Sequence, residues 1–231
     1  NFCSQIAAAI ERERFNEHRH QVELAETSEK LYKTLLNAVS HEFRTPLSVI
    51  SGAIETLTDA ALSLPEPSRH ELLQEIQRAA SRLHRLVENL LDMSRLDSGR
   101  IYPKLEWCEI GDVFSALCRR FEPDIPSHPI EFNIIDHMPL IFIDPGLLEQ
   151  ALAHIIQNAI RYTPAESNIE ISARLADAQL HLTLLDHGVG IPEDALPHLF
   201  EKFFRVAGTS SGGPGLGLSI CKGMIESMHG T

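Results

Sequence analysis

Cysteine is scarce in this sequence, and long apolar runs are absent. The 231 residues include only four cysteines, which lie far apart and form no C-x-x-C pair. The sequence therefore indicates neither a zinc site nor a disulfide framework, and it suits a reducing cytosol. No apolar stretch approaches the roughly 20 residues that a membrane span needs, and no secretory signal opens the chain.

Positive charge is also in short supply. The chain carries 20 lysines and arginines against 32 aspartates and glutamates, which gives a formal net charge of −12. This balance argues against nucleic acid as a partner, because phosphate backbones attract basic surfaces. The length is enough for one large domain or for two small ones with real cores.

Glycine and proline are missing from residues 1–35. That segment is rich in Glu, Arg, Ala and Gln, which favours a continuous helix. Its apolar residues follow a rough heptad that charged residues interrupt. The pattern therefore leaves open both a helix that packs against a partner and a helix that is merely solvated.

The segment Ser40-His41-Glu42-Phe43-Arg44-Thr45-Pro46-Leu47 is the most distinctive in the chain. Apolar residues around it recur in steps of three or four, which predicts a helix that continues to about Ala60. These apolar positions are Leu36, Val39, Phe43, Leu47, Ile50, Ile54 and Leu57. His41 falls nearly opposite that apolar face, and Thr45 follows one turn later on the same exposed side.

Pro46 stands inside this predicted helix, one turn from His41. A proline there removes the amide that would bond the Glu42 carbonyl, so we expect a bend. An exposed histidine on a kinked amphipathic helix is the simplest alternative to a functional site. Zinc binding by a His-Glu-x-x-His helix is excluded, because the fourth residue after His41 is Thr45.

A second long helix is predicted from about Arg69 to Leu96, after a break at residues 62–68 that contains two prolines. Its apolar residues alternate steps of four and three: Leu72, Ile76, Ala79, Leu83, Leu86, Leu90 and Met93. A hairpin with so broad an apolar face cannot cover itself. We therefore predict that two copies form a four-helix bundle, a homodimer through residues 36–96.

Beyond Ser98-Gly99 the pattern alternates between short β-like and helical segments. Strands are predicted at residues 105–110, 130–135, 140–143, 168–175 and 179–185. Helices are predicted at residues 111–122, 145–162 and 217–228. This mixture indicates a separate α+β domain with helices layered on one face of a sheet, after a linker at residues 98–104.

The predicted helix at residues 145–162 brings four polar or amphipathic side chains to one face. They are His154, Asn158, Arg161 and Tyr162. An amide oxygen, a cation and an aromatic ring suit Mg²⁺, phosphate and adenine respectively. A solvated helix face is the alternative that the spacing alone leaves open.

Two glycine clusters strengthen the nucleotide interpretation. Asp186-His187-Gly188-Val189-Gly190 follows an apolar strand, so a carboxylate stands where a ligand can approach the backbone. Gly212-Gly213-Pro214-Gly215-Leu216-Gly217-Leu218 opens a helix, whose N-terminal amides form a natural anion site. The second cluster is not a P-loop, because no Gly-Lys-Ser/Thr follows, and its spacing also departs from G-x-G-x-x-G.

These motifs, with Phe200-Glu201-Lys202-Phe203-Phe204-Arg205 between the glycine clusters, resemble in order the H, N, G1, F and G2 boxes of sensor histidine kinases. The resemblance implies a multidomain α and α+β fold. A dimeric helical hairpin would precede an α/β sandwich ATP-binding domain of the GHKL (Bergerat) type, which gyrase, Hsp90 and MutL share. Residues 90–99, followed by Trp107, resemble the Kdp-type osmosensitive potassium sensors most.

The resemblance also implies domain bounds: a signalling helix at residues 1–35, a dimerisation and phosphotransfer domain at 36–98 and a catalytic ATP-binding domain at 104–231. Mg²⁺ and ATP would be the cofactors. The chain is expected to be a cytoplasmic fragment of a membrane-anchored bacterial sensor, with the membrane reached only through segments outside it.

Each matching residue acquires an implied role. Asn158 would coordinate Mg²⁺, Arg161 would neutralise phosphate, and Tyr162 would lie against the adenine. Asp186 would accept a hydrogen bond from the exocyclic amine of the adenine. The remaining nucleotide-site residues are Gly188, Gly190, Lys202, Arg205, Gly213, Gly215 and Gly217. A lid at residues 206–214 would cover the phosphates.

The chain departs from the family pattern in two places. His154 stands where the family usually has a further asparagine, so the second metal or phosphate contact lacks its usual side chain. The chain also stops at Thr231, where the family continues into a final pair of strands, so the sheet is expected to lack them.

The implied reaction is ATP-dependent autophosphorylation of His41, with Glu42 as general base. Thr45 would position a water for the reverse, phosphatase activity. The phosphoryl group would pass to an aspartate in the receiver domain of a response regulator. Two alternatives remain: a mechanical ATPase that shares the GHKL fold, and a dimerisation module that binds nucleotide without kinase activity.

Overall fold

The architecture comes from a computed structural model that describes residues 39–59, 64–122, 124–125, 127–135, 138–206 and 213–231. The predicted signalling helix at residues 1–35 and most of the predicted lid at 206–214 lie outside the described residues. The chain forms two compact units, one that extends to Ala80 and one from Ser81 to Thr231.

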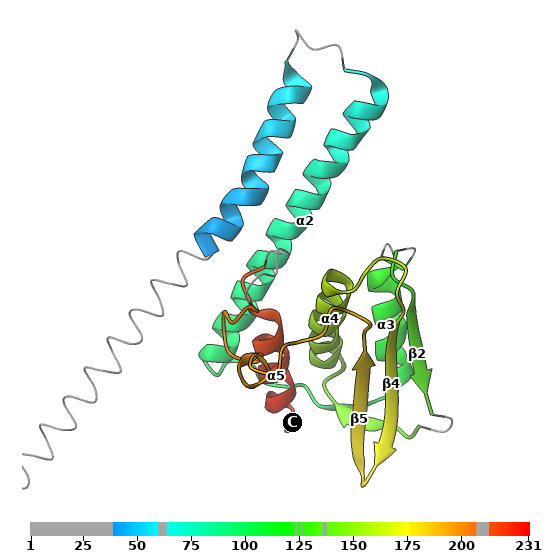
Figure 1. Ribbon diagram of the computed structural model, residues 1–231. Coiled ribbons are helices and arrows are strands. Elements are labelled where there is room, and N and C mark those ends of the chain that lie inside the picture. The colour runs from blue at the N-terminus through cyan, green and yellow to red at the C-terminus, as the bar shows by residue number, and fades with distance from the viewer. Residues whose placement is uncertain (1–38, 60–63, 123, 126, 136–137, 207–212) are drawn as a thin grey trace, which may run out of the picture. The chain divides into compact units, whose positions relative to one another are not determined.

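The described part of the first unit consists of two helices. Residues 39–58 form one helix, which continues through the buried Pro46, so the proline does not end it. The second helix, α2 (Glu66–Asp97), begins earlier than the predicted start at Arg69 (Figure 1). Pro67 lies in its first turn. Backbone N–H groups there have no intrahelical acceptor, so a proline costs the helix no hydrogen bond. The predicted break between the helices is confirmed, but it ends at Pro65 rather than at residue 68.

The apolar stripe of these helices is only partly covered within one chain. Ala53 and Ala79 are buried, whereas Leu47, Ile54 and Leu73 are 50%, 47% and 51% exposed. The two alanines are thus covered, whereas these three larger side chains are about half exposed. A single chain leaves apolar surface exposed along this hairpin.

The second unit is an α+β domain with a mixed three-stranded sheet. The sheet has the order β2-β4-β5, with β2 parallel to β4 and β5 antiparallel to β4. A separate antiparallel pair joins β1 to β3. The strands are β1 (Glu106–Cys108), β2 (Ile130–Ile134), β3 (Ile141–Ile143), β4 (Ile169–Ala176) and β5 (Gln179–Leu185). The helices are α3 (Ile110–Phe121), α4 (Pro145–Tyr162) and α5 (Gly217–Ser227).

The helices of this domain lie on one side of the sheet, as the sequence pattern predicts (Figure 1). Alternate residues of β4 point into the core, where Ile169 and Ile171 are fully buried. They pack in one cluster with Leu117 of α3 and Ile156 of α4. Every predicted strand and helix of this domain is present, with ends that differ from the prediction by a few residues at most.

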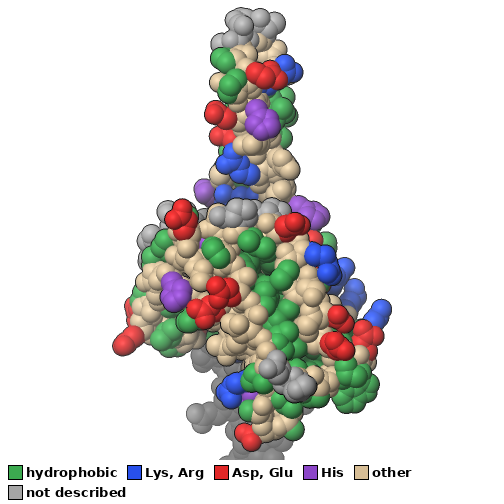
Figure 2. All heavy atoms as spheres, turned by 90° about the vertical axis from the view of Figure 1, so that its right-hand side faces the viewer, with side chains coloured by type: hydrophobic (Ala, Val, Ile, Leu, Met, Phe, Trp, Pro, Cys, Tyr) green, Lys and Arg blue, Asp and Glu red, His purple; other side chains and the backbone are tan. Residues whose placement is uncertain are grey.

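The outer face of the second unit mixes hydrophobic side chains with acidic and basic ones (Figure 2). Trp107 and Phe142 are exposed register partners in the β1–β3 pair, and their ring centres lie 5.2 Å apart. Within the described segments, no helix combines the length and the apolar content needed to cross a membrane.

Helix α4 begins where the sequence predicts because Asp144 caps it. The Oδ1 of Asp144 accepts a hydrogen bond from the Leu147 amide at 3.0 Å. The Oδ2 accepts one from the Lys104 amide at 2.7 Å. Pro145 fills the first helical position, where its fixed φ suits a helix. The cap therefore anchors the helix that carries the candidate nucleotide residues.

The C-terminal end of α2 belongs to the second unit. Three of its apolar residues pack against the buried side of α5: Leu90, Met93 and Leu96. Leu96 meets α5 at Gly223, where an added Cβ would lie 2.8 Å from a Leu96 methyl carbon. This packing explains why the two compact units divide inside α2. The domain boundary at residues 98–104 stays a prediction.

Gly223→Ala is expected to bring little or no stabilisation, although alanine favours a helix interior over glycine by about 1 kcal/mol. The Leu96 methyl groups occupy the space that the new Cβ needs. In a Leu96→Ala background the same substitution should stabilise by about 1 kcal/mol, because the space is free. Urea unfolding of the four proteins measures this coupling. An equal gain in both backgrounds would show that Leu96 does not contact α5.

Candidate functional site

His41 lies on the exposed face of the first helix, as its spacing predicts. Thr45, one turn later, is also exposed, and its Oγ1 donates a hydrogen bond to the His41 carbonyl at 3.4 Å. The neighbouring Glu42 is only 8% exposed. The helix thus offers an accessible imidazole beside a carboxylate that is largely shielded from water.

The loop after β5 lies against the end of α4 at Gly188. An added Cβ on Gly188 would lie 2.9 Å from the Tyr162 carbonyl oxygen, so this approach requires glycine. The Gly188 amide donates a hydrogen bond to Asp186 Oδ1 at 2.9 Å, which turns the loop back on itself. Gly190 has a φ of +74°, in the left-handed region that favours glycine. The loop therefore holds Asp186 beside the last residue of α4.

The second glycine cluster lies against the polar face of α4. An added Cβ on Gly213 would lie 2.5 Å from Nη1 of Arg161. At Gly217, the first residue of α5, an added Cβ would lie 3.7 Å from Nδ2 of Asn158 and 4.0 Å from Nδ1 of His154. No side chain caps this end of α5, so its first amides lack a side-chain acceptor. Residues predicted to bind phosphate and metal are thus brought together.

The segment at residues 200–205 is attached to the second glycine cluster through its backbone. The Phe203 amide donates a hydrogen bond to the Gly215 carbonyl at 2.9 Å. Gly215 has a φ of +70°, and an added Cβ would lie 2.6 Å from the Phe204 carbonyl oxygen. Phe203 itself has a φ of 68°, which is unusual for a residue with a side chain. The backbone conformations of Phe203 and Gly215 therefore fix the path of residues 213–217 beside α4.

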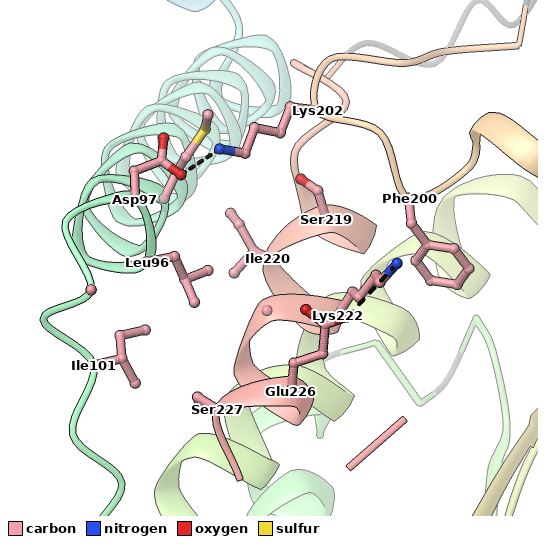
Figure 3. Close-up of a pocket in the computed structure, with 13 residues that line it drawn as sticks. Leu96, Asp97, Ile101, Phe200, Lys202, Ser219, Ile220, Lys222, Glu226 and Ser227 are labelled. Carbon is pink, nitrogen blue, oxygen red and sulfur yellow. Dashed lines mark hydrogen bonds and ion pairs between the residues drawn. The ribbon is translucent and has the colours of Figure 1, made fainter. Parts of the chain in front are cut away.

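Lys202 is directed elsewhere. Its Nζ forms an ion pair with Asp97 at the end of α2 (Figure 3). Both residues line a cavity of about 540 Å³ beside α5, where Lys222 Nζ lies 5.7 Å from the centre of the Phe200 ring. Arg205 is exposed. The nucleotide contacts expected of Lys202 and Arg205 stay predictions, and the structure gives Lys202 a different partner.

Burial, with a smaller effect of neighbouring charge, shifts the pKa of two groups on α4 and α2. Burial, with a smaller effect of the Arg120 guanidinium, lowers the pKa of His154 to about 4. Burial and then the Arg161 guanidinium lower the pKa of Arg85, which α2 contributes. The Arg161 and Arg85 guanidinium groups therefore repel each other, and a bound anion would offset that repulsion.

Sequence reasoning missed Arg85, because no motif surrounds it on its long helix. It also missed Asp97, whose lysine partner is distant in sequence. Spacing along one helix reports only neighbours on that helix. No sequence motif around Arg85 or Asp97 indicates that either residue lies near the candidate site.

A magnesium ion fits this site only as a companion of the nucleotide. In the described ranges no three His, Cys, Asp or Glu side chains converge to hold a metal by themselves. Nucleotide-bound Mg²⁺ needs fewer protein ligands, because phosphates and water supply the others. The Asn158 amide lies at the first turn of α5, with Oδ1 3.8 Å from the Cβ position of Gly217, and it suits that limited role.

Comparison with known proteins agrees with this organisation. Residues 32–99 match the His Kinase A (phospho-acceptor) domain. Residues 143–231 match the histidine kinase-, DNA gyrase B- and HSP90-like ATPase. Sensor protein KdpD of Escherichia coli is 34% identical over 231 residues, an alignment that covers 100% of this chain and 26% of KdpD. The chain thus spans about a quarter of that relative.

Solved structures support the same assignment. Histidine kinase AdeS of Acinetobacter baumannii has a TM-score of 0.58 at 26% identity, over 81% of this chain and 86% of AdeS. Histidine kinase ThkA in complex with the response regulator protein TrrA has a TM-score of 0.64 at 24% identity, over 85% of this chain and 55% of that one, and supports the fold. The chain therefore belongs to the sensor histidine kinases, with a helical phospho-acceptor region followed by an α/β ATPase domain.

Proposed function

We propose that this chain is the cytoplasmic catalytic core of a sensor histidine kinase, which transfers the γ-phosphoryl group of ATP to His41. The observation that carries the proposal is the meeting of both glycine clusters on the polar face of α4. Gly188 lies at Tyr162, Gly213 at Arg161 and Gly217 at Asn158. These contacts support the proposal, because they bring the residues proposed to bind the adenine, phosphate and metal ion to neighbouring turns of α4.

The nucleotide would lie along this face of α4. Asp186 would accept a hydrogen bond from the adenine amine, and its loop is already folded by the Gly188 amide. Arg161 and the first amides of α5 would hold the phosphates. Asn158 would bind Mg²⁺, which neutralises charge on the transferred group.

The histidine step needs a nucleophilic nitrogen with a free lone pair. A nitrogen of His41 would form a bond to the γ-phosphorus while the bond to the ADP oxygen breaks. Glu42 would accept the proton of the other ring nitrogen and keep the reacting one unprotonated. Thr45 would position a water for the reverse, phosphatase reaction at the same helix.

Two partners follow from the helical hairpin. A second copy would cover Leu47, Ile54 and Leu73, which are about half exposed in the single chain. The receiver domain of a response regulator would accept the phosphoryl group on an aspartate. The structure of ThkA with its response regulator TrrA supports a partner of this class.

Incubation of the chain with ATP labelled at either the α- or the γ-phosphate tests the proposal. Only the γ-label should be retained on the protein, and removal of divalent cations with EDTA should prevent it. One ADP should appear for each phosphoryl group retained. Repeated release of ADP and phosphate without a labelled protein would favour the mechanical ATPase. Nucleotide binding with neither product would favour the binding module.

A further inference from the structure

His154 and Asn158 reach the same point from successive turns of α4. The Cβ position of Gly217 lies 4.0 Å from Nδ1 of His154 and 3.8 Å from Oδ1 of Asn158. One nitrogen and one oxygen that can each bind a cation therefore lie beside the first turn of α5. The phosphates of a bound nucleotide would approach the same turn.

Both side chains are free to take a ligand. Neither makes a hydrogen bond within the part of the chain that the structure describes. His154 is half-buried on α4, one turn before Asn158. Glu88 and Arg120 are the charged groups that act on it, with opposite signs. One nitrogen of the imidazole therefore lies near the first residue of α5, and no described side chain bonds to it.

The type of donor atom determines which cation is preferred. Mg²⁺ strongly prefers oxygen ligands, whereas Mn²⁺ and the later divalent metals also accept imidazole nitrogen. An asparagine at position 154 would offer an amide oxygen, which suits Mg²⁺. Histidine at the same position changes the ligand set to one oxygen and one nitrogen.

We propose that His154 binds the nucleotide's divalent cation through an imidazole nitrogen, together with the Asn158 oxygen, and that the site consequently prefers Mn²⁺ to Mg²⁺. The inference rests on the proposed function, because the phosphates of a bound nucleotide must supply the remaining ligands. His154 thereby sets the metal preference of the kinase. It occupies the position of the second metal or phosphate contact, where the family usually has an asparagine.

Pulsed electron paramagnetic resonance of Mn²⁺ tests the bond itself. The chain would be loaded with Mn²⁺ and AMP-PNP, a non-hydrolysable ATP analogue, and examined for modulation from a directly bonded imidazole nitrogen. The signal should be present in the unchanged chain and absent in His154→Asn. The matched control is His181→Asn, which removes a half-buried histidine on β5 that pairs in register with Arg174. The control should keep the signal.

Calorimetric titration with AMP-PNP gives an independent readout. The unchanged chain should bind the Mn²⁺ complex about 10-fold or more tightly than the Mg²⁺ complex. In His154→Asn the two affinities should differ by no more than about 3-fold. A loss of packing alone would weaken both complexes equally and leave the ratio unchanged.

The outcomes separate this inference from the proposed function. Bound Mn²⁺ and AMP-PNP without a nitrogen signal, or a metal ratio unaffected by His154→Asn, would overturn the inference and leave the kinase proposal intact. Failure to bind AMP-PNP in the presence of either metal would contradict both this inference and the proposed kinase function.

Discussion

His41→Gln is expected to abolish phosphorylation of the chain by ATP, a loss of at least about 1,000-fold in labelling rate. A glutamine amide has no nucleophilic lone pair on nitrogen, so it cannot form the bond to phosphorus. Position 41 is exposed on its helix, and glutamine is a good helix former, so the fold should remain. Labelling with γ-labelled ATP over a time course measures the loss.

The matched control is His70→Gln, on α2 in the same unit. His70 is also exposed, and its Nε2 lies 3.0 Å from Nε2 of Gln74 in a local hydrogen bond. The control should be labelled at the rate of the unchanged chain. AMP-PNP affinity should be the same in all three proteins, since position 41 plays no part in nucleotide binding. Undiminished labelling of His41→Gln would show that the phosphoryl acceptor lies elsewhere.

Asn158→Ala should weaken binding of the Mg²⁺–AMP-PNP complex by about 100-fold. The substitution removes the amide oxygen expected to bind the metal, next to the first turn of α5. Alanine is the best helix former, so α4 should persist and the loss should be local. Calorimetric titration gives the affinity, and the unfolding free energy checks that the domain is intact.

Gln150→Ala provides the comparison for this variant. Gln150 lies on the same helix but is exposed and earlier in α4, away from the glycine clusters. Its removal should leave the affinity within about 2-fold of the unchanged chain. Equal affinities for Asn158→Ala and Gln150→Ala would refute the placement of the metal ion at Asn158.

Local signals account for the parts of the fold that the sequence predicted well. Helix α4 has its predicted bounds because Asp144 and Pro145 form a start signal before a regular apolar period. The bounds of β5 also agree with prediction. The first glycine cluster was predicted to let a ligand approach the backbone and the second to form an anion site, whereas their close contacts with Tyr162 and Arg161 came from the structure.

The features that escaped prediction depend on tertiary contacts. The start of α2 was misplaced because Pro67 reads as a breaker, although proline is tolerated in a first turn. Asp97, which pairs with Lys202, and Arg85, whose pKa the Arg161 guanidinium lowers, both lie on α2, which sequence spacing cannot relate to the ATPase domain. The packing of Leu96 at Gly223 likewise joins residues that are distant in the chain.

The most direct test of the kinase assignment is the chemistry of the labelled protein. The chain would be incubated with γ-labelled ATP and Mg²⁺, and the labelled band would then be treated with acid and, separately, with alkali. A phosphorus–nitrogen bond on histidine is cleaved by acid and survives alkali. We expect a label that acid removes and that alkali leaves in place. A label that survives acid, or no label on a chain that binds ATP, would contradict it.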